Sequence, residues 1–154
     1  MIKIELANHG CAVIDEEDYS IVSKLKWRAV FNGFTWYAIS TYHKKTVYMH
    51  RLIMKEAETC VHIDHINSNG LDNRKENLRS CNGSQNNMNR KKSMIATSIY
   101  KGVYWDRSAG RWVARVKINR KPVYERSFTR EIDAAIAYDS TAKAIFGEYA
   151  RTNF

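Results

Sequence analysis

The chain has 154 residues and a formal net charge of +9, with 25 Lys and Arg against 16 Asp and Glu. Its hydrophobic fraction of 44% and aromatic fraction of 12% exclude wholesale disorder, and no apolar run approaches the roughly 18 residues of a membrane-spanning helix. Its three cysteines form no CxxC pair, which argues against a disulfide framework or a Cys-type zinc site, and its first ten residues do not resemble a secretory signal.

The first fifty residues predict a small β-rich unit with one short helix. Apolar and polar residues alternate over 2–6, as in a strand, and Asp15 is a candidate cap for a helix that runs to about Leu25. Asn32-Gly33 is a hairpin signal between two strand-like stretches. The stretches rich in β-branched and aromatic residues predict three strands, at Trp27–Phe31, Phe34–Thr41 and Thr46–Met49. His50–Lys55 predicts a short helix.

The next segment, from Thr59 to about Lys92, predicts two strands followed by a helix. Cys60–Ile66 is typical of a strand, a polar turn follows at 67–70, and a second short strand is expected near Leu78. Ser84 is a candidate cap for a helix that begins at Gln85. A ββα unit of this size cannot bury a core of its own, so we expect it to pack on the N-terminal strands or on a ligand.

The last third predicts a three-stranded antiparallel sheet packed on one helix. After a linker at 94–99, strands are expected at Gly102–Trp105, Trp112–Ile118 and Val123–Phe128. In the second strand apolar residues alternate with a mostly polar and basic set, so one face of the sheet is expected to stay wet. Thr129 would cap the helix and Gly147 would end it. The apolar stripe expected to cover the sheet is Ile132, Ala135, Ile136, Ala142 and Ile145.

These elements predict an α+β fold in four parts. They are a β-rich unit at 1–47, the ββα module at 48–93, the linker at 94–99 and the sheet-and-helix domain at 100–154. The charge is not spread evenly over them. Residues 88–130 hold twelve basic groups against two acidic ones, and aromatic residues are interleaved with these cations. Such a density indicates a polyanionic partner and suits a phosphate backbone.

The ββα module carries a dense set of histidine, carboxylate and amide side chains. Asp and Asn supply oxygen ligands that suit Mg²⁺, and a histidine near its ordinary pKa can take a proton from water at neutral pH. Turn chemistry accounts for four of the polar residues, namely Asn67, Asn69, Asp72 and Asn73. It does not account for Asp64 and His65, which lie between Ile63 and Ile66 in an apolar stretch.

This segment resembles the HNH endonuclease motif of phage and intron-encoded homing endonucleases over residues 48–92. Asp64-His65 is similar to the Asp-His pair on the first strand, Asn77 to the central asparagine, and Asn86 to the last position of the motif. The resemblance implies that His65 is the general base and that Asn77 bonds backbone and orients it. It implies that Asp64 and Asn86 bind a divalent metal, Mg²⁺, together with the scissile phosphate.

Two alternatives within the motif stay open. His62 is the rival base, although its position two residues before Asp64 fits no role in the motif. Asn87 is the rival of Asn86 if the helix phase differs by one residue. Because neighbouring strand residues normally point to opposite faces, Asp64 and His65 are expected to lie at a twisted strand end.

Residues 100–154 resemble the AP2/ERF DNA-binding domain. The similar stretches are Tyr100–Val103, Gly110–Ala114, Tyr138-Asp139 with Ala142, and the closing Asn153-Phe154. The resemblance implies that the sheet lies in the major groove of double-stranded DNA. The implied contacts are Lys101, Tyr104, Arg107, Arg115, Lys117 and Tyr124. Lys101, Tyr104 and Arg115 differ from the residues typical of the plant proteins, so the plant sequence preference does not transfer.

The sequence therefore predicts a metal-dependent DNA endonuclease, of the homing type, targeted by an AP2-like domain. A catalytically inactive, sequence-specific DNA-binding regulator is the alternative; an RNA-binding protein fits the charge but not the pairing of modules. The expected partner is double-stranded DNA, with no membrane and no small-molecule cofactor, and the chain is expected to be a monomer or weak dimer. We expect a cytoplasmic protein, in the host cytoplasm if it is phage-encoded.

Overall fold

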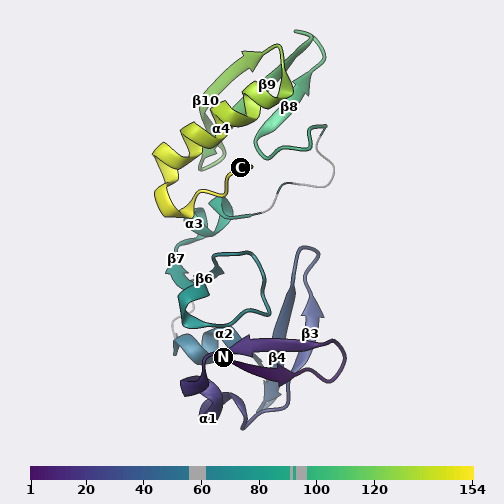
Figure 1. Ribbon diagram of the computed structural model, residues 1–154, viewed down its shortest axis with the longest axis vertical. Coiled ribbons are helices and arrows are strands. Elements are labelled where there is room, and N and C mark those ends of the chain that lie inside the picture. Colours follow the sequence, from purple (N-terminus) through teal and green to yellow (C-terminus); the bar gives the residue numbers. More distant parts are fainter. Residues whose placement is uncertain (56–61, 91, 93–96) are drawn as a thin grey trace. The chain divides into compact units, whose positions relative to one another are not determined.

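The computed structural model describes residues 1–55, 62–90, 92 and 97–154. The chain forms two compact units, Met1–Gly83 and Ser84–Phe154, which are described separately. Both contain small antiparallel sheets and few helices, so the α+β class is confirmed (Figure 1). Over the described ranges, no helix is both long and apolar enough to cross a membrane.

The first unit contains three small sheets joined by short helices. β1 pairs with β2, β3 and β5 flank β4, and β6 pairs with β7, all antiparallel. The strands are β1 (Ile2–Glu5), β2 (Cys11–Ile14), β3 (Arg28–Phe31), β4 (Trp36–Tyr42), β5 (Lys45–Tyr48), β6 (His62–His65) and β7 (Leu78–Cys81). The helices are η1 (Glu16–Asp18), α1 (Tyr19–Val22), α2 (Met49–Met54) and η2 (Lys75–Asn77), and α3 (Gly83–Met88) begins at the end of the unit. Sequence reasoning missed β2, and part of the strand predicted at 60–66 lies outside the described residues.

One apolar core holds the first unit together. Ile14, Val22 and Trp27 are buried at its centre, and the indole Nε1 of Trp27 donates to the Val22 carbonyl over 2.8 Å. Ile63 of β6 and Leu78 of β7 join the same core. The β6–β7 pair therefore packs on the N-terminal strands, as expected for a module too small to bury a core of its own.

The second unit is a three-stranded sheet covered by a long helix. The strand order is β10-β9-β8, and α4 packs on one face. Its elements are β8 (Val103–Asp106), β9 (Arg111–Ile118), β10 (Lys121–Phe128), α4 (Glu131–Phe146) and η3 (Gly147–Tyr149). Ala114 and Val116 of β9 are buried in the core under α4. Lys117, the next residue of the strand, is exposed. The predicted alternation of apolar and wet faces is thus confirmed for β9.

The predicted stripe of α4 is partly wrong. Ile136 and Ile145 are 51% and 41% exposed, and the side chains that face the sheet are Ala134, Ala135, Tyr138 and Ala142. The reason is the close approach of helix and sheet. A Cβ built on Gly102 would lie 2.0 Å from the Tyr138 ring, so this interface accepts alanine and glycine where the hydrophobicity pattern favours isoleucine.

The predicted helix caps are also corrected. Asp15 precedes η1 but makes no capping bond; its carboxylate accepts the backbone N–H of Lys75 over 2.8 Å. Arg130, not Thr129, precedes α4, and it pairs with Asp133 in the first turn. α3 begins at Gly83, so Ser84 lies inside that helix. Gly147 ends α4 with a φ of 55°, as predicted.

Candidate nuclease centre and nucleic-acid interface

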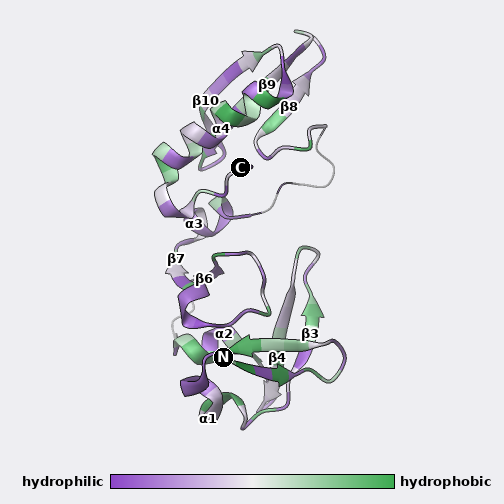
Figure 2. Cartoon of the chain, viewed as in Figure 1, coloured by the Kyte–Doolittle hydropathy of each residue, from purple (hydrophilic) through white to green (hydrophobic). Residues whose placement is uncertain are grey.

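The candidate centre lies on the β6–β7 pair of the first unit. Antiparallel register places Asp64 opposite Arg79 and His65 opposite Leu78. The segment that joins the two strands is mostly hydrophilic (purple in Figure 2). Asp64 and His65 are both buried although they are adjacent on the strand. Two adjacent residues of β6 therefore place a carboxylate and an imidazole in the protein interior.

Asp64 forms an ion pair with a residue that the sequence analysis did not single out. Its Oδ2 accepts bonds from Nη2 of Arg79 over 2.8 Å and from Nε over 3.1 Å. Both side chains are largely buried. A buried carboxylate needs such a counter-charge, because the desolvation of an unpaired charge is costly. The cross-strand register offers Arg79 as that counter-charge.

His65 is surrounded by aromatic rings and one amide. It is 4% exposed, and its ring lies 5.1 Å from that of His50 and 5.7 Å from that of Tyr37, both edge-on. Its Nε2 lies 3.3 Å from Oδ1 of Asn73. Burial lowers the pKa of His65, while the Asn73 contact and the charges of Asp64 and Asp72 oppose that shift. The imidazole is therefore neutral at neutral pH and able to accept a proton.

Asn77 holds both ends of the loop that follows His65. Its Oδ1 accepts the backbone N–H of Asn67 over 3.0 Å, and its Nδ2 donates to the carbonyl of Asp72 over 2.7 Å. The backbone N–H of Ile66, the residue after His65, donates to the Asn77 carbonyl over 2.9 Å. Asn77 thus fixes the backbone directly beyond His65.

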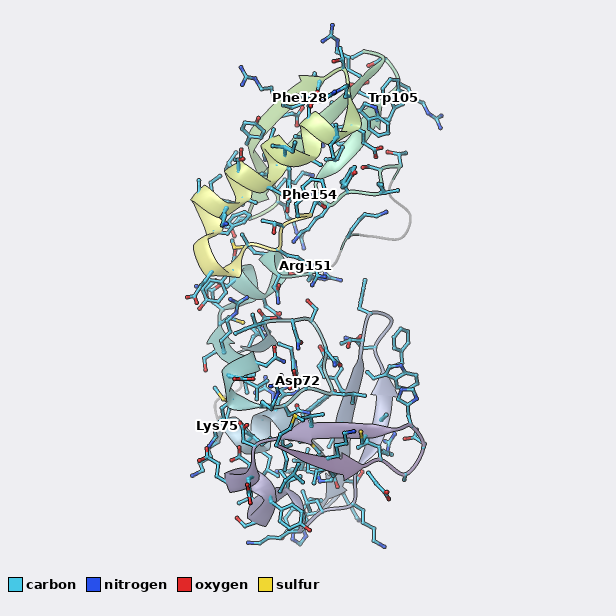
Figure 3. The ribbon with its side chains drawn as sticks, in the orientation of Figure 1. Asp72, Lys75, Trp105, Phe128, Arg151 and Phe154 are labelled. Carbon is cyan, nitrogen blue, oxygen red and sulfur yellow. The ribbon has the colours of Figure 1, made fainter. Side chains whose placement is uncertain are left out.

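Ionic contacts fasten the same loop. Asp72 binds the Arg74 guanidinium over 2.8 Å and accepts from the Asn67 amide over 2.8 Å, and Lys75 pairs with Glu17; Asp72 and Lys75 are labelled in Figure 3. The Arg74 contact lowers the pKa of the Asp72 carboxyl. Asn67 and Asn69 accept local backbone N–H groups, which confirms their prediction as turn residues.

Besides Arg79, three residues of this centre were missed by sequence reasoning. Asn73 was assigned to the turn, yet it contacts the His65 ring. Tyr37, on β4, lies outside the motif segment, and His50, on α2, lies at its start but was given no role; the fold brings both rings to His65. Burial and the neighbouring charges lower the pKa of His50 to about 3, so it stays neutral beside His65.

The other motif residues lie at the start of β6 and on α3. His62 is exposed at the start of β6, and a Cβ built on Gly83 would lie 3.5 Å from its Nε2. Asn86 and Asn87 both lie on α3, Asn86 half-buried and Asn87 exposed. In the parts of the chain that the structure describes, no group of three or more His, Cys, Asp and Glu side chains is placed to hold a metal ion.

The second unit contains a hollow of about 780 Å³ with cationic side chains on its walls. Four of the predicted DNA contacts line it, namely Lys101, Tyr104, Arg115 and Lys117. Asn87, Arg120 and apolar side chains such as Phe146 complete it. The Lys101 ammonium donates to the Met88 carbonyl, and burial together with the charge of Arg151 lowers the pKa of Lys101 to about 8.

Arg115 and Tyr104 form a contact pair on the wet face of the sheet. The Arg115 guanidinium lies 4.5 Å from the centre of the Tyr104 ring, donates to its hydroxyl and pairs with Glu125. Arg107 is exposed in the β8–β9 turn. Tyr124 is opposite Val116 in the sheet and packs against the core under α4, so it does not share the face of Arg115.

Comparison with known proteins gives one significant relative. A curated protein of Acanthamoeba polyphaga mimivirus, described as an uncharacterized HNH endonuclease, is 29% identical over 147 residues, which cover 92% of this chain and 74% of the relative. No family model matches the chain, and no solved structure matches it significantly. The similarity supports an HNH nuclease family and a nuclease function for this chain.

Proposed function

We propose that this protein is a metal-dependent DNA endonuclease with its catalytic centre on β6 and β7. The observation that carries the proposal is the placement of Asp64 and His65 side by side in the interior, beside a loop that Asn77 bonds at both ends. The similarity to a protein described as an HNH endonuclease supports the same reaction class. On this proposal the chain hydrolyses phosphodiester bonds in double-stranded DNA.

His65 is the proposed general base. Its lowered pKa keeps the imidazole neutral at neutral pH, so it can take a proton from the attacking water. Asn77 keeps the backbone after His65 in one conformation, and the Tyr37 and His50 rings limit rotation of the imidazole.

Asp64 and Asn86 are the residues that would hold a divalent cation. Both supply oxygen, and Mg²⁺ binds through one or two protein oxygens while phosphate and water complete its shell. Each of these side chains is a donor that suits Mg²⁺; Asp64 belongs to the first unit and Asn86 to the second, and Arg79 is a competing cation at Asp64. When bound, the cation would neutralise charge on the scissile phosphate and on the leaving 3′-oxygen.

The second unit is the proposed DNA-binding part, with an AP2-like role for its sheet. Lys101, Arg115, Lys117 and Arg120 place four cationic groups around one hollow, and a phosphate backbone is the polyanion such groups suit. Arg107, which is exposed in the β8–β9 turn, is retained as a proposed contact, whereas Tyr124 packs against the core under α4 and is not retained. The resemblance of residues 48–92 to homing endonucleases adds a proposed homing role, in which the protein cuts DNA near its own gene.

A DNA-binding regulator without nuclease activity is the second candidate, favoured by the buried state of His65 and the pairing of Asp64 with Arg79. Incubation of the purified chain with plasmid DNA and with DNA that flanks its own coding sequence separates the two. An endonuclease converts the DNA to nicked or linear products with Mg²⁺ and stops when EDTA is added. Tight binding without cleavage under Mg²⁺, Mn²⁺, Co²⁺ or Ni²⁺ would instead establish the regulator.

Lys117 tests the DNA-binding proposal. The side chain is exposed on β9 and lines the hollow, so Lys117→Ala should weaken DNA binding for all sequences and lower the slope of log K against log salt by about one unit. Fluorescence anisotropy over a salt series measures both. Lys143→Ala, an exposed lysine of α4 outside that hollow, is the matched control and should leave the slope unchanged. An unaltered slope for Lys117→Ala removes this residue from the phosphate contacts.

The lowered pKa of Lys101 predicts that the affinity for DNA depends on pH. Its pKa of about 8 means that the ammonium is charged below pH 8 and neutral above it, so phosphate attraction is present at low pH and lost as the pH rises. The affinity of the wild type should therefore fall between about pH 7 and about pH 9.5, a range in which arginine and ordinary lysines stay charged. Lys101→Arg should bind independently of pH over this range. An equal fall in both proteins would show that another group titrates.

A further inference from the structure

The side chain of Asn73 is fixed by the backbone of the first unit. The loop between β6 and β7 lies along β2, with Val13 N–H donating to the Leu71 carbonyl over 2.8 Å and Asn73 N–H donating to the Val13 carbonyl over 2.7 Å. Asn73 is 0% exposed. These bonds use main-chain atoms only, so they position the Asn73 side chain and persist when that side chain is changed.

The amide oxygen of Asn73 faces the imidazole. Oδ1 lies 3.3 Å from His65 Nε2 in a buried contact. A carbonyl oxygen can only accept, so this contact is a hydrogen bond only when Nε2 carries a proton. A neutral imidazole has a single N–H, and Nδ1 is then left with its lone pair. The orientation of the Asn73 amide is therefore linked to which ring nitrogen of His65 carries the proton.

The reversed amide would have the opposite consequence. With Nδ2 facing the ring, Nε2 would have to accept and Nδ1 would carry the proton, which leaves no lone pair for a reaction. In the observed orientation Nδ2 is buried without a hydrogen-bond partner among the residues described. Only this orientation keeps its bond when the ring gains a second proton, because an imidazolium donates from both nitrogens.

We propose that Asn73 is a positioning residue whose side-chain oxygen holds the Nε2–H tautomer of His65 and leaves Nδ1 as the proton acceptor. The inference rests on the proposed function, since it assigns the reacting atom of that base. In the reaction Nδ1 takes one proton from water, the water oxygen bonds to phosphorus, and the bond from phosphorus to the 3′-oxygen breaks. The 3′-oxygen then takes a proton from solvent.

The tautomer can be measured without DNA. The full chain labelled with ¹⁵N-histidine has five histidines, and the spectrum of His65→Gln identifies the signals of His65. Long-range ¹H–¹⁵N spectra, recorded well above the ordinary histidine pKa of about 6.5, distinguish a protonated from an unprotonated ring nitrogen. Wild type is expected to show Nε2–H and unprotonated Nδ1 for His65.

Asn73→Leu keeps the branched shape of the side chain and removes the acceptor, so the His65 tautomer should become mixed or reverse. Asn73→Asp restores an acceptor and should restore the Nε2–H form. Asn69→Ala, an exposed asparagine of the same loop, is the matched control and should leave the His65 signals as in wild type. A wild-type Nδ1–H form, or an unchanged tautomer in Asn73→Leu with the other histidine signals intact, would overturn the proposal.

Cleavage kinetics give the second readout. Asn73→Leu should lower kcat by roughly 10- to 100-fold, the usual effect of removing a supporting contact, with DNA affinity unchanged, and Asn73→Asp should recover most of the rate. Wild-type kcat in Asn73→Leu would overturn the positioning role. If the wild type cleaves no DNA, the proposed function fails, and the tautomer spectra alone decide whether Asn73 controls His65.

Discussion

Arg79→Met should lower the free energy of unfolding by about 3 kcal/mol. The guanidinium donates two bonds to Oδ2 of Asp64, and both side chains are largely buried, so the change leaves a carboxylate in the interior without its main counter-charge. Denaturant titration followed by circular dichroism measures the loss. Arg74→Met is the matched control: Arg74 also pairs with carboxylates, but its side chain is 31% exposed and the expected loss is smaller.

The same variant tests whether Asp64 can hold a cation. The change removes a cation that competes for the Asp64 carboxylate, so added Mg²⁺ should raise the melting temperature of Arg79→Met more than that of the wild type, following the linkage of ligand binding to folding. The double variant Asp64→Asn, Arg79→Met should regain much of the lost stability and should not respond to Mg²⁺. An equal response in the single and double variants would place any bound Mg²⁺ elsewhere.

The sequence was most informative where one periodicity determined a strand. The alternation along 112–118 predicted both the bounds and the two faces of β9, because a pleated strand needs little beyond its own residues to fix what it buries. α4 shows the limit. Which of its residues face the sheet depends on how closely the helix approaches Gly102, and the helix sequence alone does not determine that distance. Periodicity therefore predicted that Ile136 is buried, whereas it is exposed.

The residues of the candidate centre were likewise predictable from the sequence only in part. Asp64, His65 and Asn77 were predictable because they lie within one short segment with a distinctive spacing. Their partners were not. Arg79 reaches Asp64 through strand register, and Tyr37 and His50 reach His65 from another sheet and a helix. Asp15 likewise bonds Lys75 across the unit rather than its own helix. Long-range packing, not local pattern, decides these contacts.

His65→Gln carries the largest expected effect on activity. Glutamine nearly keeps the size of the side chain but cannot accept the proton of water, and loss of a general base typically slows a reaction by roughly 10²- to 10⁴-fold. DNA affinity should be unchanged, because the proposed cationic contacts lie in the other unit. His62→Gln, the exposed histidine of the same strand, is the matched control and should retain the wild-type rate. Single-turnover assays with excess protein measure the rates.

A cleavage map decides whether this chain hydrolyses DNA with His65 as the base. Wild type, His65→Gln and His62→Gln are incubated with Mg²⁺ and end-labelled DNA that flanks the protein's own coding sequence. The wild type and His62→Gln should make a discrete cut that EDTA abolishes, and His65→Gln should cut at least 100-fold more slowly. Cutting by His65→Gln at the wild-type rate and position would contradict it.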